Sequence, residues 1–204
     1  MLRVGLTGGI ASGKTTAAQI LHDLGAATFD ADRIVAELYR PGAPGAKEVE
    51  RLFGSDLIAP DGSVSKPALA NLAFSDPAKR TALEAAIHPL VIERIRRAFA
   101  EARSAGANVA VAEASQLLEG GYEREFDRVL LVVAPLATRL ARGQARGSSR
   151  ADMDRRVAGQ LAEEAARTKA DDVIENGGTR EDLRRRVEGL YRRWIAPNAP
   201  PATV

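Results

Sequence analysis

The chain contains no cysteine and only two histidines among its 204 residues. The lack of cysteine excludes a disulfide framework, a thiolate zinc site and a cysteine nucleophile. Two histidines argue against a metal site built from several imidazoles. No apolar run reaches the roughly 18 residues of a membrane-spanning helix, so we expect no membrane segment. The opening residues, MLRVGLTGG, lack the apolar centre of a secretory signal, and we predict a cytoplasmic protein.

Aromatic residues make up only 4% of the chain, whereas hydrophobic residues make up 45%. A core must therefore consist mainly of alanine, valine, leucine and isoleucine. The length suits one domain, and we predict a single domain over residues 1–204. The formal net charge is +2, and acidic and basic residues alternate in helical segments such as 181–193. This mixture is typical of solvated helix faces and predicts no nucleic-acid partner.

Short apolar runs alternate with segments of helical spacing along most of the chain. This order predicts an α/β fold in three layers, with right-handed crossovers onto a parallel sheet. The middle, residues 45–105, holds only helical segments and predicts a substrate subdomain inserted into a core of residues 1–44 and 106–194. The predicted strands are 2–7, 26–29, 108–112, 128–133 and 172–175, the predicted helices outside the middle are 14–24, 32–39, 135–146, 151–169 and 179–194, and the tail 196–204 is expected to be loose.

The residues after the first predicted strand fit the pattern G-x-x-x-x-G-K-[ST], which is typical of the P-loop that binds nucleotide phosphates. Backbone N–H groups of such a loop surround an anion, and the N-terminus of the following helix adds its dipole. Lys14 supplies a charge for the β- and γ-phosphates, and the Thr15 hydroxyl is a ligand for Mg²⁺. The predicted ATP-binding residues here are Gly8, Gly9, Ile10, Ala11, Ser12, Gly13, Lys14, Thr15 and Thr16.

The loop indicates nucleotide binding without specifying a reaction. A guanine-reading N-K-x-D motif is absent, and a motor domain would usually be larger. A short chain with a helical insertion and an arginine-bearing segment at about 139–155, which we predict to be a lid, favours a kinase of a small metabolite.

Two carboxylates follow the second predicted strand, in the run Asp30-Ala31-Asp32. The carboxyl ends of parallel strands face the ligand crevice of an open sheet. Asp32 could therefore accept a proton from a substrate hydroxyl, or it could cap the next helix.

Together these residues resemble the dephospho-coenzyme A kinase family. The resemblance rests on Thr7-Gly8-Gly9-Ile10, Phe29-Asp30-Ala31-Asp32, His88-Pro89, Leu117-Leu118-Glu119, Arg142, Arg146, Gln160 and the run 170–176, in the family's order over about residues 2–194. The departures are Ala11 in place of a usual glycine, Ser115-Gln116 in place of Pro-Leu, and a lid about one residue short at Gly147. The resemblance implies a P-loop fold and Mg²⁺-dependent transfer of phosphate from ATP to the ribose 3′-hydroxyl of dephospho-coenzyme A, in a monomer or weak homo-oligomer.

The resemblance also implies roles for single residues. Asp32 matches the proposed base or orienter of the substrate hydroxyl, and Asn176 falls near the adenine of ATP. Lys14 with the lid arginines Arg142 and Arg146 would act on the phosphates. The expected substrate-binding residues are Asp32, His88, Lys66 and Glu119, of which Lys66 could meet the acidic tail of coenzyme A or be solvated.

Several alternatives stay open. Arg139, Arg142 and Arg146 would share one helix face, which could close over triphosphate or form a solvated stripe paired with Asp152 or Glu163. His88 precedes a proline, which disfavours helix at that position, and could bind substrate or satisfy buried backbone groups. The chain as a whole could instead be a nucleoside or nucleotide kinase, or an ATP-binding module without catalysis.

Overall fold

The computed structural model describes residues 1–196. The tail predicted to be loose, residues 196–204, therefore falls outside the described residues except for residue 196. The chain divides into two compact units. One unit combines residues 1–30 with the chain from Phe99 onward, and the other covers Ala31–Ala98. Within residues 1–196, no helix is both long and apolar enough to cross a membrane.

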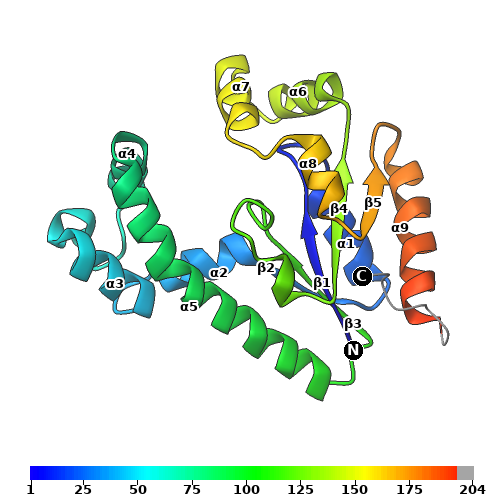
Figure 1. Cartoon of the computed structure of the whole chain (residues 1–204), viewed down its shortest axis with the longest axis horizontal. Helices are drawn as coiled ribbons and strands as arrows, with labels where there is room; N and C mark the ends of the chain where they lie inside the picture. Colours follow the sequence, from blue (N-terminus) through cyan, green and yellow to red (C-terminus); the bar gives the residue numbers. More distant parts are fainter. Residues whose placement is uncertain (197–204) are drawn as a thin grey trace. The chain divides into compact units, whose positions relative to one another are not determined.

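The first unit contains a five-stranded sheet in which all strands run parallel (Figure 1). The order across the sheet is β2-β3-β1-β4-β5, so β1 lies at the centre between β3 and β4. The five predicted strands are confirmed: three match to the residue at both ends, and the other two, predicted at 26–29 and 108–112, begin and end one residue later. The strands are β1 (Leu2–Thr7), β2 (Ala27–Asp30), β3 (Val109–Glu113), β4 (Arg128–Val133) and β5 (Asp172–Glu175).

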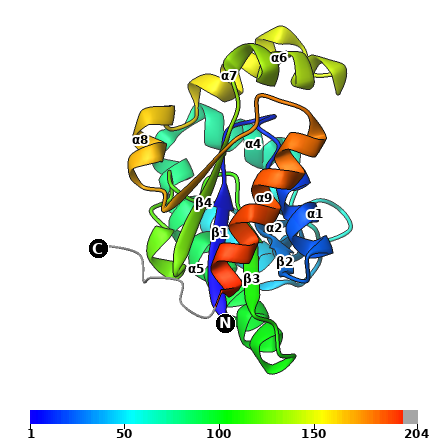
Figure 2. The same cartoon turned by 90° about the vertical axis from the view of Figure 1, so that its right-hand side faces the viewer.

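Alternate residues of each strand point to opposite faces of the sheet. Val4 and Leu6 of β1 are fully buried against α1 (Lys14–Asp23) and α9 (Arg180–Ile195), which Figure 2 shows in front of the strands. The opposite face is covered by α8 (Glu163–Thr168) and by aromatic side chains including Phe126. Both faces are covered, which confirms the three-layer α/β prediction and explains why the central strands are continuous apolar runs.

The second unit is helical. It contains α2 (Ala31–Leu38), α3 (Pro44–Phe53), the short helix η1 (Ser55–Leu57), α4 (Lys66–Ser75) and most of α5 (Pro77–Ser104). Its β-structure is a single bridge between Ile58 and Val64. The middle of the chain is therefore helical, and its compact unit spans Ala31–Ala98, so that it includes α2, which contacts α3. Its role as a substrate subdomain stays a prediction.

The break predicted at His88-Pro89 is wrong, because α5 runs through Pro89 without ending. Proline in a helix interior removes one hydrogen bond and costs about 3 kcal/mol. Ile87, Val91 and Ile95 are buried at helical spacing around it. Burial of one large aliphatic side chain contributes about 1.5–3 kcal/mol, so this packing outweighs the cost of the proline.

A single helix over residues 151–169 is also wrong. The segment forms α7 (Arg150–Ala158) and α8, separated by a link at residues 159–162, whereas α6 (Leu136–Ala145) is close to its prediction. Glu119 accepts a hydrogen bond from the backbone N–H of Leu161 at 3.1 Å. This tertiary contact holds the link out of helical form. A short helix, η2 (Glu123–Glu125), precedes β4.

The last helix, α9, begins with a capping box, which the spacing of Thr179 and Asp182 in the sequence predicts. The Thr179 hydroxyl accepts from the Asp182 N–H at 3.1 Å, and the Asp182 carboxylate accepts from the Thr179 N–H at 3.0 Å. Hydrogen bonds from Thr179, together with Arg185, lower the pKa of Asp182 to about 2. The carboxylate therefore stabilises the fold only while it is ionised.

We expect Asp182→Asn to lower the urea midpoint of unfolding at pH 6, by an amount that shrinks as the pH falls from about 4 towards 2. A carboxyl whose pKa is depressed in the folded state contributes stability above its unfolded pKa and loses it as pH falls through the folded value. Urea titrations of both proteins at pH 6, 4 and 3 measure this. In a Thr179→Ala background the effect should be smaller, and an offset independent of pH would contradict the assignment.

Candidate functional site

The loop Gly8–Thr15 connects the carboxyl end of the central strand β1 to the first turn of α1. Gly13 lies directly before the helix with φ of 103°, in the left-handed region. A Cβ atom at this position would overlap the side-chain nitrogen of Asn176. Glycine is therefore required both by the backbone conformation and by the close approach of Asn176.

Lys14, near the helical end of the loop, is buried. Its ammonium donates hydrogen bonds to the carbonyl oxygens of Gly8 at 2.8 Å and Gly9 at 3.3 Å. These two hydrogen bonds fix the positive charge of Lys14 next to the backbone of Gly8 and Gly9. A cation at that position, together with the N-terminus of α1, is an arrangement suited to an anion.

Thr15 donates a hydrogen bond from its hydroxyl to Glu113 Oε1 at 2.8 Å. Glu113 ends β3, where it pairs in register with Leu6 of β1 and Asp30 of β2. It is not among the predicted site residues. The signal that could have found it is an acidic residue directly after a buried strand, at the same sheet edge as Asp30.

The donor set at this position fits a magnesium ion. Mg²⁺ prefers oxygen ligands and usually keeps several waters while one or two protein groups and the substrate's phosphates hold it. The Thr15 hydroxyl and the Glu113 carboxylate supply such oxygens side by side. Within residues 1–196 no cluster of three or more His, Cys, Asp and Glu side chains is placed to hold a metal. An ion here would therefore depend mainly on phosphate oxygens and water.

The two aspartates of the predicted acidic pair lie in different units. Asp30 is the last residue of β2 and is exposed. Asp32 lies in the first turn of α2, inside the helix that begins at Ala31, and is also exposed. Asp32 therefore follows the carboxyl end of β2 by two residues, and its catalytic role stays a prediction.

The three arginines of α6 and its C-terminal end differ in what they contact. Arg139 is half-buried and donates from Nε to the Ile10 carbonyl at 2.9 Å. Burial lowers the pKa of Arg139, while nearby Glu163 acts in the opposite direction. Arg142 makes longer contacts, at 3.4 Å to the carbonyl of Ser12 and 3.5 Å to that of Gly178, and Arg146 is exposed at the C-cap.

The pairings proposed for these arginines as a solvated stripe are not the ones found. Asp152 forms ion pairs with Arg155 and Arg156, and Glu163 forms one with Arg167. Arg139 and Arg142 instead contact the phosphate loop. Arg142 is thereby brought to the loop, as is Arg139 with a shorter contact, whereas Arg146 is exposed at the end of α6.

Asn176 directly follows β5 and is buried. Its side-chain N–H donates to the Ser12 carbonyl at 2.7 Å, so its amide group supports the phosphate loop. Its predicted place near the adenine of ATP is not tested by this contact and stays a prediction.

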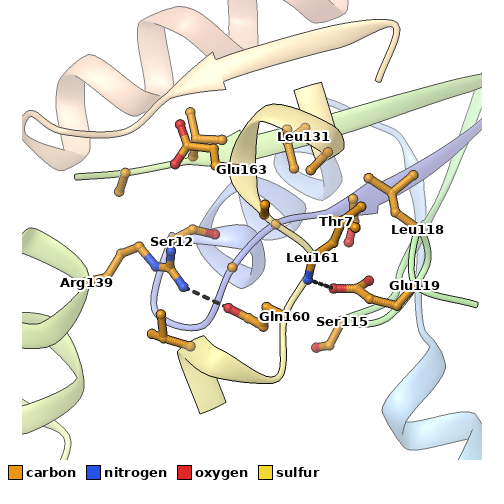
Figure 3. Close-up of a pocket in the computed structure, with 17 residues that line it drawn as sticks. Thr7, Ser12, Ser115, Leu118, Glu119, Leu131, Arg139, Gln160, Leu161 and Glu163 are labelled. Carbon is orange, nitrogen blue, oxygen red and sulfur yellow. Dashed lines mark hydrogen bonds between the residues drawn. The ribbon is translucent and has the colours of Figure 1, made fainter. Parts of the chain in front are cut away.

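A cavity of about 150 Å³ lies behind the loop (Figure 3). Its wall includes Thr7, Ser12, Ser115, Arg139 and Gln160. Ser12 Oγ is buried and has no hydrogen-bond partner within the described part of the chain. The cavity thus brings polar groups from β1, the segment after β3 and the α7–α8 link to one side of the loop.

The other predicted substrate-binding residues belong to different units. His88 lies inside α5, where burial lowers its pKa, and Lys66 is the exposed first residue of α4. Both belong to the second unit. Glu119 lies in the first unit, beside the cavity.

Comparison with known proteins places this geometry in a family. A model of the dephospho-CoA kinase family matches residues 2–182. A dephospho-CoA kinase of Geobacter sulfurreducens is 38% identical over 191 residues, which cover 93% of this chain and 97% of that protein.

Solved structures agree with these matches. The Thermus thermophilus protein TT1252 is 36% identical and has a TM-score of 0.80. The match covers 96% of this chain and 98% of that protein. The dephospho-CoA kinase of Campylobacter jejuni is 24% identical with a TM-score of 0.70, over 94% of this chain and 96% of its own, and shares the fold. The chain belongs to the dephospho-CoA kinase family.

Proposed function

We propose that the chain transfers the terminal phosphoryl group of ATP to the ribose 3′-hydroxyl of dephospho-coenzyme A. The observation that carries the proposal is the phosphate loop Gly8–Thr15, with Lys14 and Thr15 at its helical end, in a chain that matches dephospho-CoA kinases over residues 2–182. The products are coenzyme A and ADP, and this transfer completes the cofactor.

The phosphate loop and Lys14 bind the β- and γ-phosphates through N–H groups and positive charge. Thr15 and Glu113 would hold Mg²⁺, directly or through its waters. The ion, when bound, neutralises charge on the phosphate oxygens. Positioning and electrostatics supply most of the rate in this chemistry, so these residues act mainly by holding the phosphates in place.

The 3′-oxygen forms a bond to the γ-phosphorus while the bond from that phosphorus to the bridging oxygen breaks, and ADP leaves. Asp32 orients the 3′-hydroxyl or takes its proton. Arg142 and Arg146 stabilise the charge on the transferring group. His88, Lys66 and Glu119 are assigned to substrate binding, and Asn176 to the nucleotide.

Three further predictions belong with this proposal. They are a cytoplasmic location, the absence of a nucleic-acid partner, and a monomer or weak homo-oligomer. All three stay predictions.

The function is tested by incubating the purified chain with labelled ATP, magnesium and an acceptor. We expect label in coenzyme A, at the 3′ position, when dephospho-coenzyme A is supplied. Nucleosides and nucleoside monophosphates serve as competing acceptors, and faster transfer to any of them would replace the proposed substrate. Binding of ATP without transfer to any acceptor would indicate a binding module.

Asp32→Asn should lower kcat by about a hundredfold or more, because the amide cannot accept the hydroxyl proton. Binding of an ATP analogue, measured by calorimetry, should stay within about twofold of the unchanged chain. The matched control is Asp56→Asn, an exposed aspartate of η1 in the same unit, which should leave kcat unchanged. Near-normal turnover of Asp32→Asn would remove Asp32 from the mechanism.

Glu113→Gln should raise the concentration of free magnesium needed for half-maximal rate by about tenfold, because a charged oxygen ligand is lost. The side chain keeps its size and can still accept a hydrogen bond from Thr15. Initial rates at saturating ATP over a range of free magnesium measure the effect, and a chelator should abolish activity in both proteins. An unchanged magnesium requirement would exclude Glu113 from the metal site.

A further inference from the structure

The peptide groups of Ile10, in the front half of the phosphate loop, are held by two side chains from distant parts of the chain. The N–H of Ile10 donates to Gln160 Oε1 at 3.0 Å, and Arg139 Nε donates to the Ile10 carbonyl at 2.9 Å. Arg139 also donates from Nη2 to Gln160 Oε1 at 2.7 Å, as the dashed line in Figure 3 marks. Three hydrogen bonds therefore link these residues, and we call Arg139 with Gln160 the loop clamp.

The loop clamp needs a loop without a side chain at position 9. A Cβ atom on Gly9 would overlap the guanidinium group of Arg139. Arg139 therefore lies directly against the backbone of the phosphate loop. Arg139 can lie there because residue 9 is a glycine.

The residue after Ile10 has a conformation that needs such support. Ala11 has φ of 56° and is the one non-glycine residue with positive φ in residues 1–196. This conformation costs roughly 1–2 kcal/mol for a residue with a Cβ, and it persists when the surroundings hold it. On the other side of Ala11, the Ser12 carbonyl accepts from Asn176 at 2.7 Å. Ala11 is thus fixed from both sides.

We propose that Gln160 and Arg139 are positioning residues for the reaction, which hold the phosphate loop in its ATP-binding form by fixing Ile10 against the strain at Ala11. The inference rests on the proposed function only in that the loop receives ATP. Neither residue needs to touch the reacting atoms. Their effect is expected in ATP affinity, because a loop that must be ordered by its ligand binds that ligand less tightly.

The first test is Gln160→Met, which keeps the length of the side chain and removes the oxygen that accepts both hydrogen bonds. We expect the Kd for a non-hydrolysable ATP analogue with magnesium, and the KM for ATP, to rise about tenfold. The KM for dephospho-coenzyme A should stay within about twofold. The control is Gln19→Met on the exposed face of α1, which should change neither value.

Two further variants separate a clamp from a general structural role. Arg139→Lys keeps the charge but loses the paired donors, and it should weaken ATP binding by a similar factor. The double variant with Gln160→Met should bind no more weakly than the weaker single variant, because both changes break one unit. If one of the two single variants folds poorly, the other single variant still tests the clamp.

The most specific test adds Ala11→Gly, since glycine takes positive φ at little cost. In this background Gln160→Met should weaken ATP binding by less than about threefold. Normal ATP binding by Gln160→Met, or a full tenfold loss in the Ala11→Gly background, would overturn the clamp. Product formation by the unchanged chain is followed in parallel, so a chain that binds ATP but modifies no acceptor refutes the proposed function and not the clamp.

Discussion

The site depends on the conformation of one short loop, because Lys14 and Thr15 are part of Gly8–Thr15, and Arg142 and Glu113 contact it. The loop joins the central strand of the sheet to α1, so its two ends are fixed by the most buried part of the molecule. Within the middle of the loop, the Ser12 N–H donates to the Gly9 carbonyl at 3.1 Å. Further support comes from three distant side chains, namely Asn176 directly after β5, Arg139 of α6 and Gln160 of the α7–α8 link.

Much of the fold follows from local patterns. The strands were predictable because a sheet covered on both faces requires continuous apolar runs, as in Arg128–Val133. The capping box was predictable because Thr179 and Asp182 have the spacing at which each bonds the other's backbone. The phosphate loop was predictable because its glycines and lysine are required by the conformation itself. In each case the cause lies within a few residues of the effect.

The features that could not be predicted depend on contacts between distant segments. A proline is normally a break, and only the packing of Ile87, Val91 and Ile95 explains why α5 continues. The division between α7 and α8 depends on Glu119, some forty positions earlier. In the site, the partnership of Glu113 with Thr15 follows from the order of strands, which places β3 beside β1. The family resemblance named Gln160 but carried no information on what it touches.

The course of the chain between its two units has a mechanical consequence. The chain passes from one unit to the other between Asp30 and Ala31, where a strand is followed at once by a helix, and between Ala98 and Phe99, in the interior of α5. Neither passage is a loop, because both lie in regular secondary structure. A change of backbone conformation at either crossing must therefore alter a strand–helix junction or the interior of a helix.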